Sequence, residues 1–276
     1  MPSTTKEVSG TARRRGVEAI ETGGRLLAVL ADAEGPMMLR DLAAAAQMAP
    51  AKAHRYLVSL IRIGLARQLP DSGRYDIGAL AIRLGAAGLG RGDALAFARE
   101  RLPALRDGLG LSVALATWID SRVLIVDWLD ARALVAASLR IGASMPLTRS
   151  ATGRAFAAFD RRPGVATALR EELAANARAG LHPATAAEFD AVLRSTRAHG
   201  IARVSGDLVA GIDSLAAPVY GRGGELAMVV AAIGPSRGID IAWNGPVARR
   251  LRAWADETGA RREPAQASTP GSTTPS

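Results

Sequence analysis

The chain has 276 residues and a formal net charge of +9, from 35 basic and 26 acidic side chains. It contains no cysteine, which excludes disulfides and thiolate metal sites. Residues 1–92 carry 13 basic and 8 acidic side chains, a net of +5, so positive charge is concentrated in the first third of the chain.

We expect no targeting signal among the N-terminal residues. No apolar stretch of signal-peptide length follows their basic residues, and no apolar run in the chain is long enough to span a bilayer. We therefore expect a cytoplasmic protein without a membrane partner. Residues 1–16 are polar with an Arg13-Arg14-Arg15 cluster and are predicted to form a flexible arm, which either lies along DNA or is a solvated tail.

Residues 17–77 are predicted to form a three-helix unit with a β-hairpin. The first helix covers residues 17–33, with a packing face made by Ala19, Ile20, Gly23, Leu26, Leu27 and Leu30. A second helix is expected to end near Gln47, and Pro50 stands at the first position of a third, where its missing amide costs nothing. Two short helices around a tight turn form a helix-turn-helix, which makes double-stranded DNA the first partner to consider.

The third helix is amphipathic. Ala53, Leu57, Leu60 and Ile61 share its packing face. Small residues at the start of the other face allow close approach to the major groove, and its cations and hydroxyls can reach phosphates and base edges. The candidate DNA-binding residues on this face are Ala51, Lys52, Arg55, Tyr56 and Ser59.

A hairpin is expected to follow this helix. Residues 65–69 read as a strand, Asp71-Ser72-Gly73 as a turn, and residues 74–77 as the returning strand, which completes a winged helix. Arg74 begins the returning strand, where it either reaches a phosphate or the minor groove or stays solvated.

Residues 78–92 are predicted to form a linker helix, in which Leu80, Ala81 and Leu84 repeat at helical spacing and Arg83 is the charged residue of the apolar run. An apolar helix next to a small domain needs a partner surface. We expect a second copy of the chain to supply it, in a dimer or a tetramer.

Residues 93–261 read as an α+β domain with a mostly antiparallel sheet. Helices are expected over residues 93–109, 150–159, 165–179, 185–199 and 245–259, and strands over residues 111–118, 122–129, 133–141, 201–205, 212–220 and 225–233. Residues 262–276 are rich in Pro, Ser and Thr and are predicted to be disordered.

The motifs of enzymes and metal sites are missing from the sequence. There is no phosphate-binding loop ending in Gly-Lys-Ser/Thr and no Gly-x-Ser-x-Gly elbow. His54, His182 and His199 lie far apart, without a spacing that places two of them on one helix face. We therefore expect no catalysis, no cofactor and no metal.

Five segments, in this order, resemble the IclR-type bacterial transcriptional regulators. They are MAPAKAHRYLVSLIRIGL (residues 48–65), DSGRYDIG (71–78), LGAAGL (84–89), GASMPLTRSATGRAFAAF (142–159) and GIDSLAAPVYGRGGELAMVVAAIGP (211–235). The resemblance covers about residues 17–261 and implies a winged helix-turn-helix over residues 17–77, a linker helix over 78–92 and a GAF-like effector-binding domain over 93–261. The implied protein binds a DNA operator and responds to a small-molecule effector.

The chain departs from the family pattern at three places. Ala51 and Lys52 stand where the family often has Ser-Thr, which puts the usual base contacts in doubt. Gly153-Arg154-Ala155 replaces Gly-Lys-Ala, and Ser214 replaces a frequent cysteine.

In relatives the effector lies in a cavity over the sheet. The residues of this chain that the resemblance places around that cavity are Ala151, Thr152, Ile212, Ser214, Ala231 and Ile233. This set offers hydroxyls and a helix N-terminus rather than charge, which favours a small, partly apolar carboxylate or aromatic ligand. Arg149 either pairs with such a carboxylate or points to solvent.

Two alternatives to a transcriptional regulator stay open at this point. One is a winged-helix module that binds protein and has no operator preference. The other is an enzyme with a DNA-binding appendage.

Overall fold

The computed structural model describes residues 17–90, 93–131 and 140–259. The chain divides into two compact units, residues 1–87 and residues 88–276. The predicted arm over residues 1–16 and the predicted tail over residues 262–276 lie outside the described residues. Within the described ranges, no helix combines the length and the apolar character that crossing a bilayer demands.

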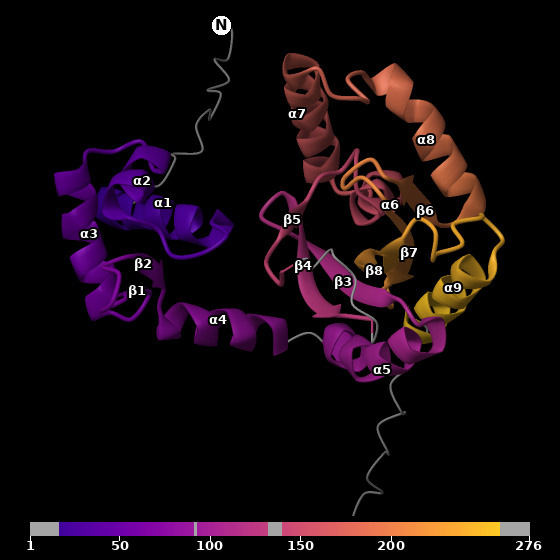
Figure 1. Cartoon of the computed structure of the whole chain (residues 1–276), viewed down its shortest axis with the longest axis horizontal. Coiled ribbons are helices and arrows are strands. Elements are labelled where there is room, and N and C mark those ends of the chain that lie inside the picture. Colours follow the sequence, from indigo (N-terminus) through magenta and orange to yellow (C-terminus); the bar gives the residue numbers. More distant parts are fainter. Residues whose placement is uncertain (1–16, 91–92, 132–139, 260–276) are drawn as a thin grey trace, which may run out of the picture. The chain divides into compact units, whose positions relative to one another are not determined.

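The first unit is the expected winged helix (Figure 1). Its elements are α1 (Glu18–Asp32), α2 (Leu39–Ala45), α3 (Pro50–Arg62), β1 (Ala66–Gln68) and β2 (Tyr75–Ile77). The strands β1 and β2 pair antiparallel, with Ala66 opposite Ile77. One core joins the three helices and the hairpin through Leu26, Leu42, Leu57 and Tyr75.

The packing face of α1 is shorter than predicted. Gly23, Leu26 and Leu30 are buried as expected, but Ala19 is exposed and Ile20 is 73% exposed. The periodic pattern continues one turn beyond the part of the helix that reaches α2 and α3. Ala19 and Ile20 are therefore exposed apolar residues, and their assignment to the packing face was wrong.

The linker helix α4 (Ala79–Gly90) is present and has no buried residue. Ile82 and Leu84 are 61% and 58% exposed. A helix that presents side chains of this kind to solvent gains stability only when another surface covers it.

The second unit is built on a six-stranded sheet in the order β5-β4-β3-β8-β7-β6, in which every neighbouring pair is antiparallel. The mostly antiparallel sheet predicted from the sequence is therefore confirmed. The helices are α5 (Asp93–Leu109), α6 (Ala151–Phe159), α7 (Pro163–Ala179), α8 (Ala186–His199) and α9 (Pro246–Gly259); the strands are β3 (Ser112–Ile119), β4 (Arg122–Leu129), β5 (Ser144–Met145), β6 (Ala202–Ser205), β7 (Ile212–Tyr220) and β8 (Leu226–Pro235).

One predicted strand differs. Most of the strand expected over residues 133–141 lies outside the described residues, and Ile141 is in a turn. The edge of the sheet is instead the two-residue strand β5, in which Met145 pairs with Val123 of β4.

Side chains of the sheet alternate between two helix layers, because successive residues of a strand point to opposite faces. On β8, Val229, Ala231 and Ile233 pack on the face that α6 covers, while Val230 and Ala232 pack on the face of α5 and α9. Figure 1 shows α6 between the sheet and the outer helices α7 and α8.

Candidate DNA-binding and effector-binding sites

The turn between α2 and α3 positions the candidate DNA-binding helix. Gln47 adopts a left-handed conformation with φ of 54°, and the Met48 amide donates to the Ala43 carbonyl at 3.0 Å, which ends α2. Pro50 then occupies the first turn of α3, as the sequence predicts. Leu57 and Leu60 are buried, so one face of α3 is fixed to the core and the opposite face is available.

The available face of α3 carries the predicted residues, with two qualifications. Ala51 and Arg55 are exposed and Lys52 is half-buried. Tyr56 is also half-buried, because its ring packs against the core of this unit. The Ser59 hydroxyl donates to the Arg55 carbonyl at 3.4 Å, a weak bond within its own helix. Lys52 and Arg55 are therefore the cations of this helix best placed for phosphates or base edges.

The wing, which is the β1–β2 hairpin, contains two arginines with different partners. Arg67 pairs with Asp76 across the hairpin, at 2.6 Å between Nη2 and the carboxylate. Arg74 is exposed and donates from Nη1 to the Pro36 carbonyl at 3.1 Å. That bond holds the wing against the loop before α2 and leaves the rest of the Arg74 guanidinium at the surface.

The N-terminus of α6 is built by close backbone packing. The Ser150 hydroxyl caps the helix by accepting from the Gly153 amide at 2.9 Å, and it donates to the Pro146 carbonyl at 2.7 Å. A Cβ on Gly153 would lie 2.0 Å from the Pro146 oxygen, so only glycine fits there. These contacts place Ala151 and Thr152 against the sheet, where both are buried.

A cavity of about 240 Å³ lies between the start of α6 and this face of the sheet, and we call it the α6 cavity. Six of the seven predicted effector residues line it: Ala151, Thr152, Ile212, Ser214, Ala231 and Ile233. The structure adds residues that the sequence argument missed: Ala114, Ile125, Trp128, Met145, Ser150, Val204, Leu208 and Val209. Ala114 and Ile125 lie on the same face of the sheet as Ala231 and Ile233. The alternation of residues along β3 and β4 could have predicted that they line the cavity.

The polar groups of the α6 cavity are neutral. None of the lining residues that the structure describes is charged, and the hydroxyls among them come from Ser150, Thr152 and Ser214. The Ser150 and Thr152 oxygens lie 3.2 Å apart. The first turn of α6 faces the same space, and free amides at a helix N-terminus favour an anion. The cavity can therefore hold a small apolar body with one anionic or polar end.

Arg149, the seventh predicted residue, does not line the cavity. Its Nε and Nη2 donate to the Asp207 carbonyl at 3.0 and 2.6 Å. Arg154 reaches the carboxylate of the same residue and also donates to the carbonyls of Thr148 and Arg203, both at 2.8 Å. Burial lowers the pKa of Arg154, and the charge of Asp207 opposes that effect.

Asp207 therefore fastens the loop of residues 206–211, whose Leu208 and Val209 line the α6 cavity. Gly206 and Gly211 border this loop with φ of 71° and 79°, conformations that favour glycine. Arg154, which stands where the resembling family usually has lysine, thus contributes an ion pair that holds this wall of the α6 cavity in place.

We expect Asp207→Asn to loosen this wall. The Asp207 side chain is 40% exposed, so solvent weakens its pairing and the loss is about 1 kcal/mol, or fivefold in local opening. Amide hydrogen exchange at residues 208–211 should accelerate by that factor. Asp190→Asn, on the exposed face of α8, is the matched control and should change nothing. Unchanged exchange in the Asp207 variant would show that the loop is held by other contacts.

The histidines do not form a metal site in the part of the chain that the structure describes, where no group of three His, Asp or Glu residues could hold an ion. His54 is exposed on α3. His182 lies 3.3 Å from the Glu188 carboxylate, and His199 stacks on Trp243 with ring centroids 4.4 Å apart.

Comparisons with known proteins match both parts of the chain. Residues 19–70 match the IclR helix-turn-helix domain, and residues 86–259 match the bacterial transcriptional regulator IclR C-terminal domain. The glycerol operon regulatory protein of Streptomyces griseus is 33% identical over 223 residues, covering 80% of this chain and 84% of that protein.

Two solved structures are also similar. HmgR of Pseudomonas aeruginosa is 34% identical, with a TM-score of 0.54 and coverage of 88% of this chain and 97% of that one. An IclR homologue of Microbacterium hydrocarbonoxydans, complexed with 4-hydroxybenzoate, is 20% identical with a TM-score of 0.69, covering 87% and 97%. At 20% identity, the similarity to this second structure shows a shared fold and nothing more.

A helix-turn-helix joined to an effector-binding domain defines a ligand-responsive transcriptional regulator. The chain belongs to the IclR family of bacterial transcriptional regulators.

Proposed function

We propose that the protein binds its operator through the exposed face of α3 and that a ligand in the α6 cavity modulates this binding. The observation that carries the proposal is the α6 cavity itself, which is lined by Thr152 and Ser214 and, within the described ranges, by no charged side chain. On the DNA side, Lys52 and Arg55 stand on the helix face opposite the buried Leu57. Ala51, Tyr56, Ser59 and Arg74 complete the proposed DNA-binding surface.

The proposed ligand is a small carboxylate or aromatic metabolite. Ala151, Ala231 and Ile233 offer apolar contacts, and the hydroxyls with the first turn of α6 offer a place for one anionic group. The 4-hydroxybenzoate complex of a structural neighbour is consistent with this class. Since Arg149 is bound to the Asp207 carbonyl, we propose that it acts on the ligand only through that loop.

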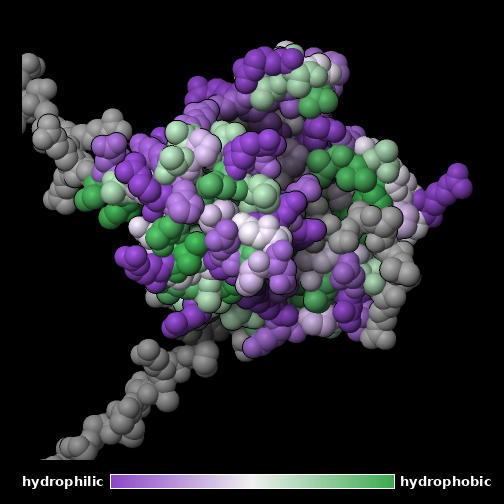
Figure 2. All heavy atoms as spheres, turned by 60° about the vertical axis from the view of Figure 1, so that its left-hand side comes forward, coloured by the Kyte–Doolittle hydropathy of each residue, from purple (hydrophilic) through white to green (hydrophobic). Residues whose placement is uncertain are grey.

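We propose that the active form is a dimer or a dimer of dimers. Val17, Ile20, Ile82 and Leu84 are exposed apolar residues of α4 and of the start of α1. Figure 2 shows apolar groups lying among polar ones on one face of the molecule. A second copy that covers them would remove apolar area from water and present two recognition helices to a near-palindromic site.

We further propose that the protein acts in the cytoplasm, without catalysis, and that its C-terminal domain is related to GAF domains. We also propose that the winged-helix domain ends at residue 77 and that residues 78–92 form the linker to the effector-binding domain.

The test of this function is binding to the intergenic DNA upstream of its own gene, measured by fluorescence polarisation with scrambled DNA of equal length as the reference. We expect a preference of about 1,000-fold at physiological salt. Equal, strongly salt-dependent binding to both DNAs would leave only phosphate contacts and would favour a winged helix that binds protein.

Arg55→Ala is expected to weaken binding to this operator by about tenfold, because a base or phosphate contact is worth about 1–3 kcal/mol. Arg55 makes no hydrogen bond with another side chain in the described part of the chain, so the fold should be unchanged by circular dichroism. Arg194→Ala, an exposed arginine of α8, is the control and should bind as the wild type does. Full affinity in the Arg55 variant would contradict the role of this helix face.

A further inference from the structure

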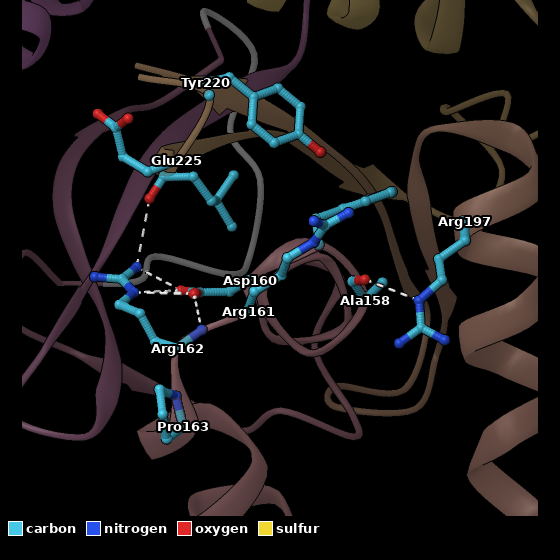
Figure 3. Close-up of a pocket in the computed structure, with 11 residues that line it drawn as sticks. Ala158, Asp160, Arg161, Arg162, Pro163, Arg197, Tyr220 and Glu225 are labelled. Atoms are coloured by element: carbon cyan, nitrogen blue, oxygen red, sulfur yellow. Dashed lines mark hydrogen bonds and ion pairs between the residues drawn. The ribbon is translucent and has the colours of Figure 1, made fainter. Parts of the chain in front are cut away.

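A second cavity lies at the other end of α6. Its volume is about 1,120 Å³, and we call it the arginine pocket. Phe159 at the end of α6, Arg161 and Arg162 in the link to α7, Arg197 on α8, and Tyr220 and Leu226 from the β7–β8 hairpin line it (Figure 3). The α6 cavity lies at the opposite end of the helix, at residues 150–152, and the two cavities have no described lining residue in common.

One arginine of the pocket is already neutralised. The Asp160 side chain is only 3% exposed and accepts from Arg162 Nε at 2.9 and 2.8 Å and from the Arg162 backbone amide at 2.9 Å. Arg162 also reaches the Leu226 carbonyl at 3.4 Å. This pair uses the buried carboxylate of the pocket and removes it as a partner for the other arginines.

The other two arginines keep donors for a ligand. Arg161 makes no hydrogen bond or ion pair with any residue that the structure describes. Arg197 uses Nε on the Ala158 carbonyl at 2.9 Å, and its two Nη atoms have no acceptor among the described residues. In Figure 3 the carboxylate of Glu225 points away from both of them.

Tyr220 adds a neutral donor beside Arg161. Its hydroxyl and the Arg161 guanidinium point toward the same region in Figure 3. Burial raises the pKa of Tyr220, and the positive charge of Arg161 lowers it in part. The phenol therefore stays protonated at neutral pH and can donate a hydrogen bond to an anion.

We propose that the arginine pocket binds a phosphate-bearing small molecule at a site separate from the α6 cavity. Arg161 and Tyr220 point toward one region from different elements, and Arg197 lines the same pocket from α8. Several donors of this kind suit the several oxygens of a tetrahedral phosphate. Phe159, Pro163 and Leu226 supply apolar walls for the rest of the ligand, and the pocket is large enough for a metabolite.

Pyrophosphate is the probe for this site, titrated into the full chain by isothermal calorimetry in chloride buffer of constant ionic strength. We expect one pyrophosphate per chain and a loss of about tenfold in affinity for Arg161→Gln, since one charge-assisted contact is removed. Tyr220→Phe, which removes only the hydroxyl, should weaken binding by about threefold. Neither change disturbs a hydrogen bond of the described fold.

Two controls locate the binding. Arg194→Gln, on the same helix as Arg197 but outside the pocket, should bind pyrophosphate as the wild type does. Arg55→Ala should also leave it unchanged, because it alters the DNA-binding helix alone. Absence of binding, equal affinity in the Arg161 variant, or loss of binding in the Arg55 variant would each overturn the proposal. Operator binding does not enter this test, so its outcome is independent of the proposed function.

Discussion

Ser214→Leu is expected to abolish the response of operator binding to an effector while operator binding itself persists. Ser214 lies on β7 with its side chain lining the α6 cavity, opposite Ile233 on β8. Leucine occupies space in a cavity of only about 240 Å³ and removes the Ser214 hydroxyl from its lining. Overpacking costs about 1–3 kcal/mol, which the second unit can tolerate, and α3 belongs to the other unit.

The measurement is operator binding by polarisation, with and without a panel of small aliphatic and aromatic carboxylates. Ser214→Ala is the matched variant, because it removes the hydroxyl and keeps the space. We expect it to respond with affinity weakened by about tenfold, the value of one hydrogen bond. A Ser214→Leu protein that still responds normally would place the effector outside this cavity.

Gly153→Ala is expected to destabilise the second unit by about 3 kcal/mol or more, since the added Cβ meets backbone that cannot turn away. It would lie 2.0 Å from the Pro146 oxygen and 2.6 Å from the Leu147 Cα. The Ser150 cap and the packing of Gly153 against the Pro146 carbonyl also shape the α6 cavity. Any relaxation that accommodates the methyl group therefore shifts Ala151 and Thr152.

Thermal unfolding of the full chain followed by calorimetry tests this expectation, with a fall of about 10 °C for the second unit. Gly108→Ala is the control, because the nearest atom to its added Cβ is an Arg250 side-chain nitrogen at 3.7 Å and α5 accepts alanine well. If both variants melt like the wild type, the close packing under α6 is not a constraint on stability.

Periodicity explains why so much of the fold could be predicted. Leu57 and Leu60 mark the buried face of α3, and the alternation along β8 marks the two faces of the sheet. Pro50 and Ser150 add local signals for where helices begin. Such patterns record burial, and burial decides where these elements lie.

The limits of the prediction have physical reasons too. The pattern of α1 shows that Ile20 is apolar but not that the helix extends past its neighbours. Leu208 and Val209 reach the α6 cavity through an irregular loop that tertiary contacts of Asp207 hold, and no periodicity marks it. The resemblance located six residues that line the α6 cavity. The residues of the arginine pocket lie between positions 158 and 226 of the sequence, and only the folded chain brings them together.

The scarcity of lysine has a practical consequence for α3. The sequence contains only Lys6 and Lys52, and Lys52 is half-buried on the helix face proposed to meet DNA. An amine-specific reagent therefore modifies a single side chain in the part of the chain that the structure describes. Protection of that amine by operator DNA, read by mass spectrometry of the Lys52 peptide, would report directly on whether α3 is covered in the complex.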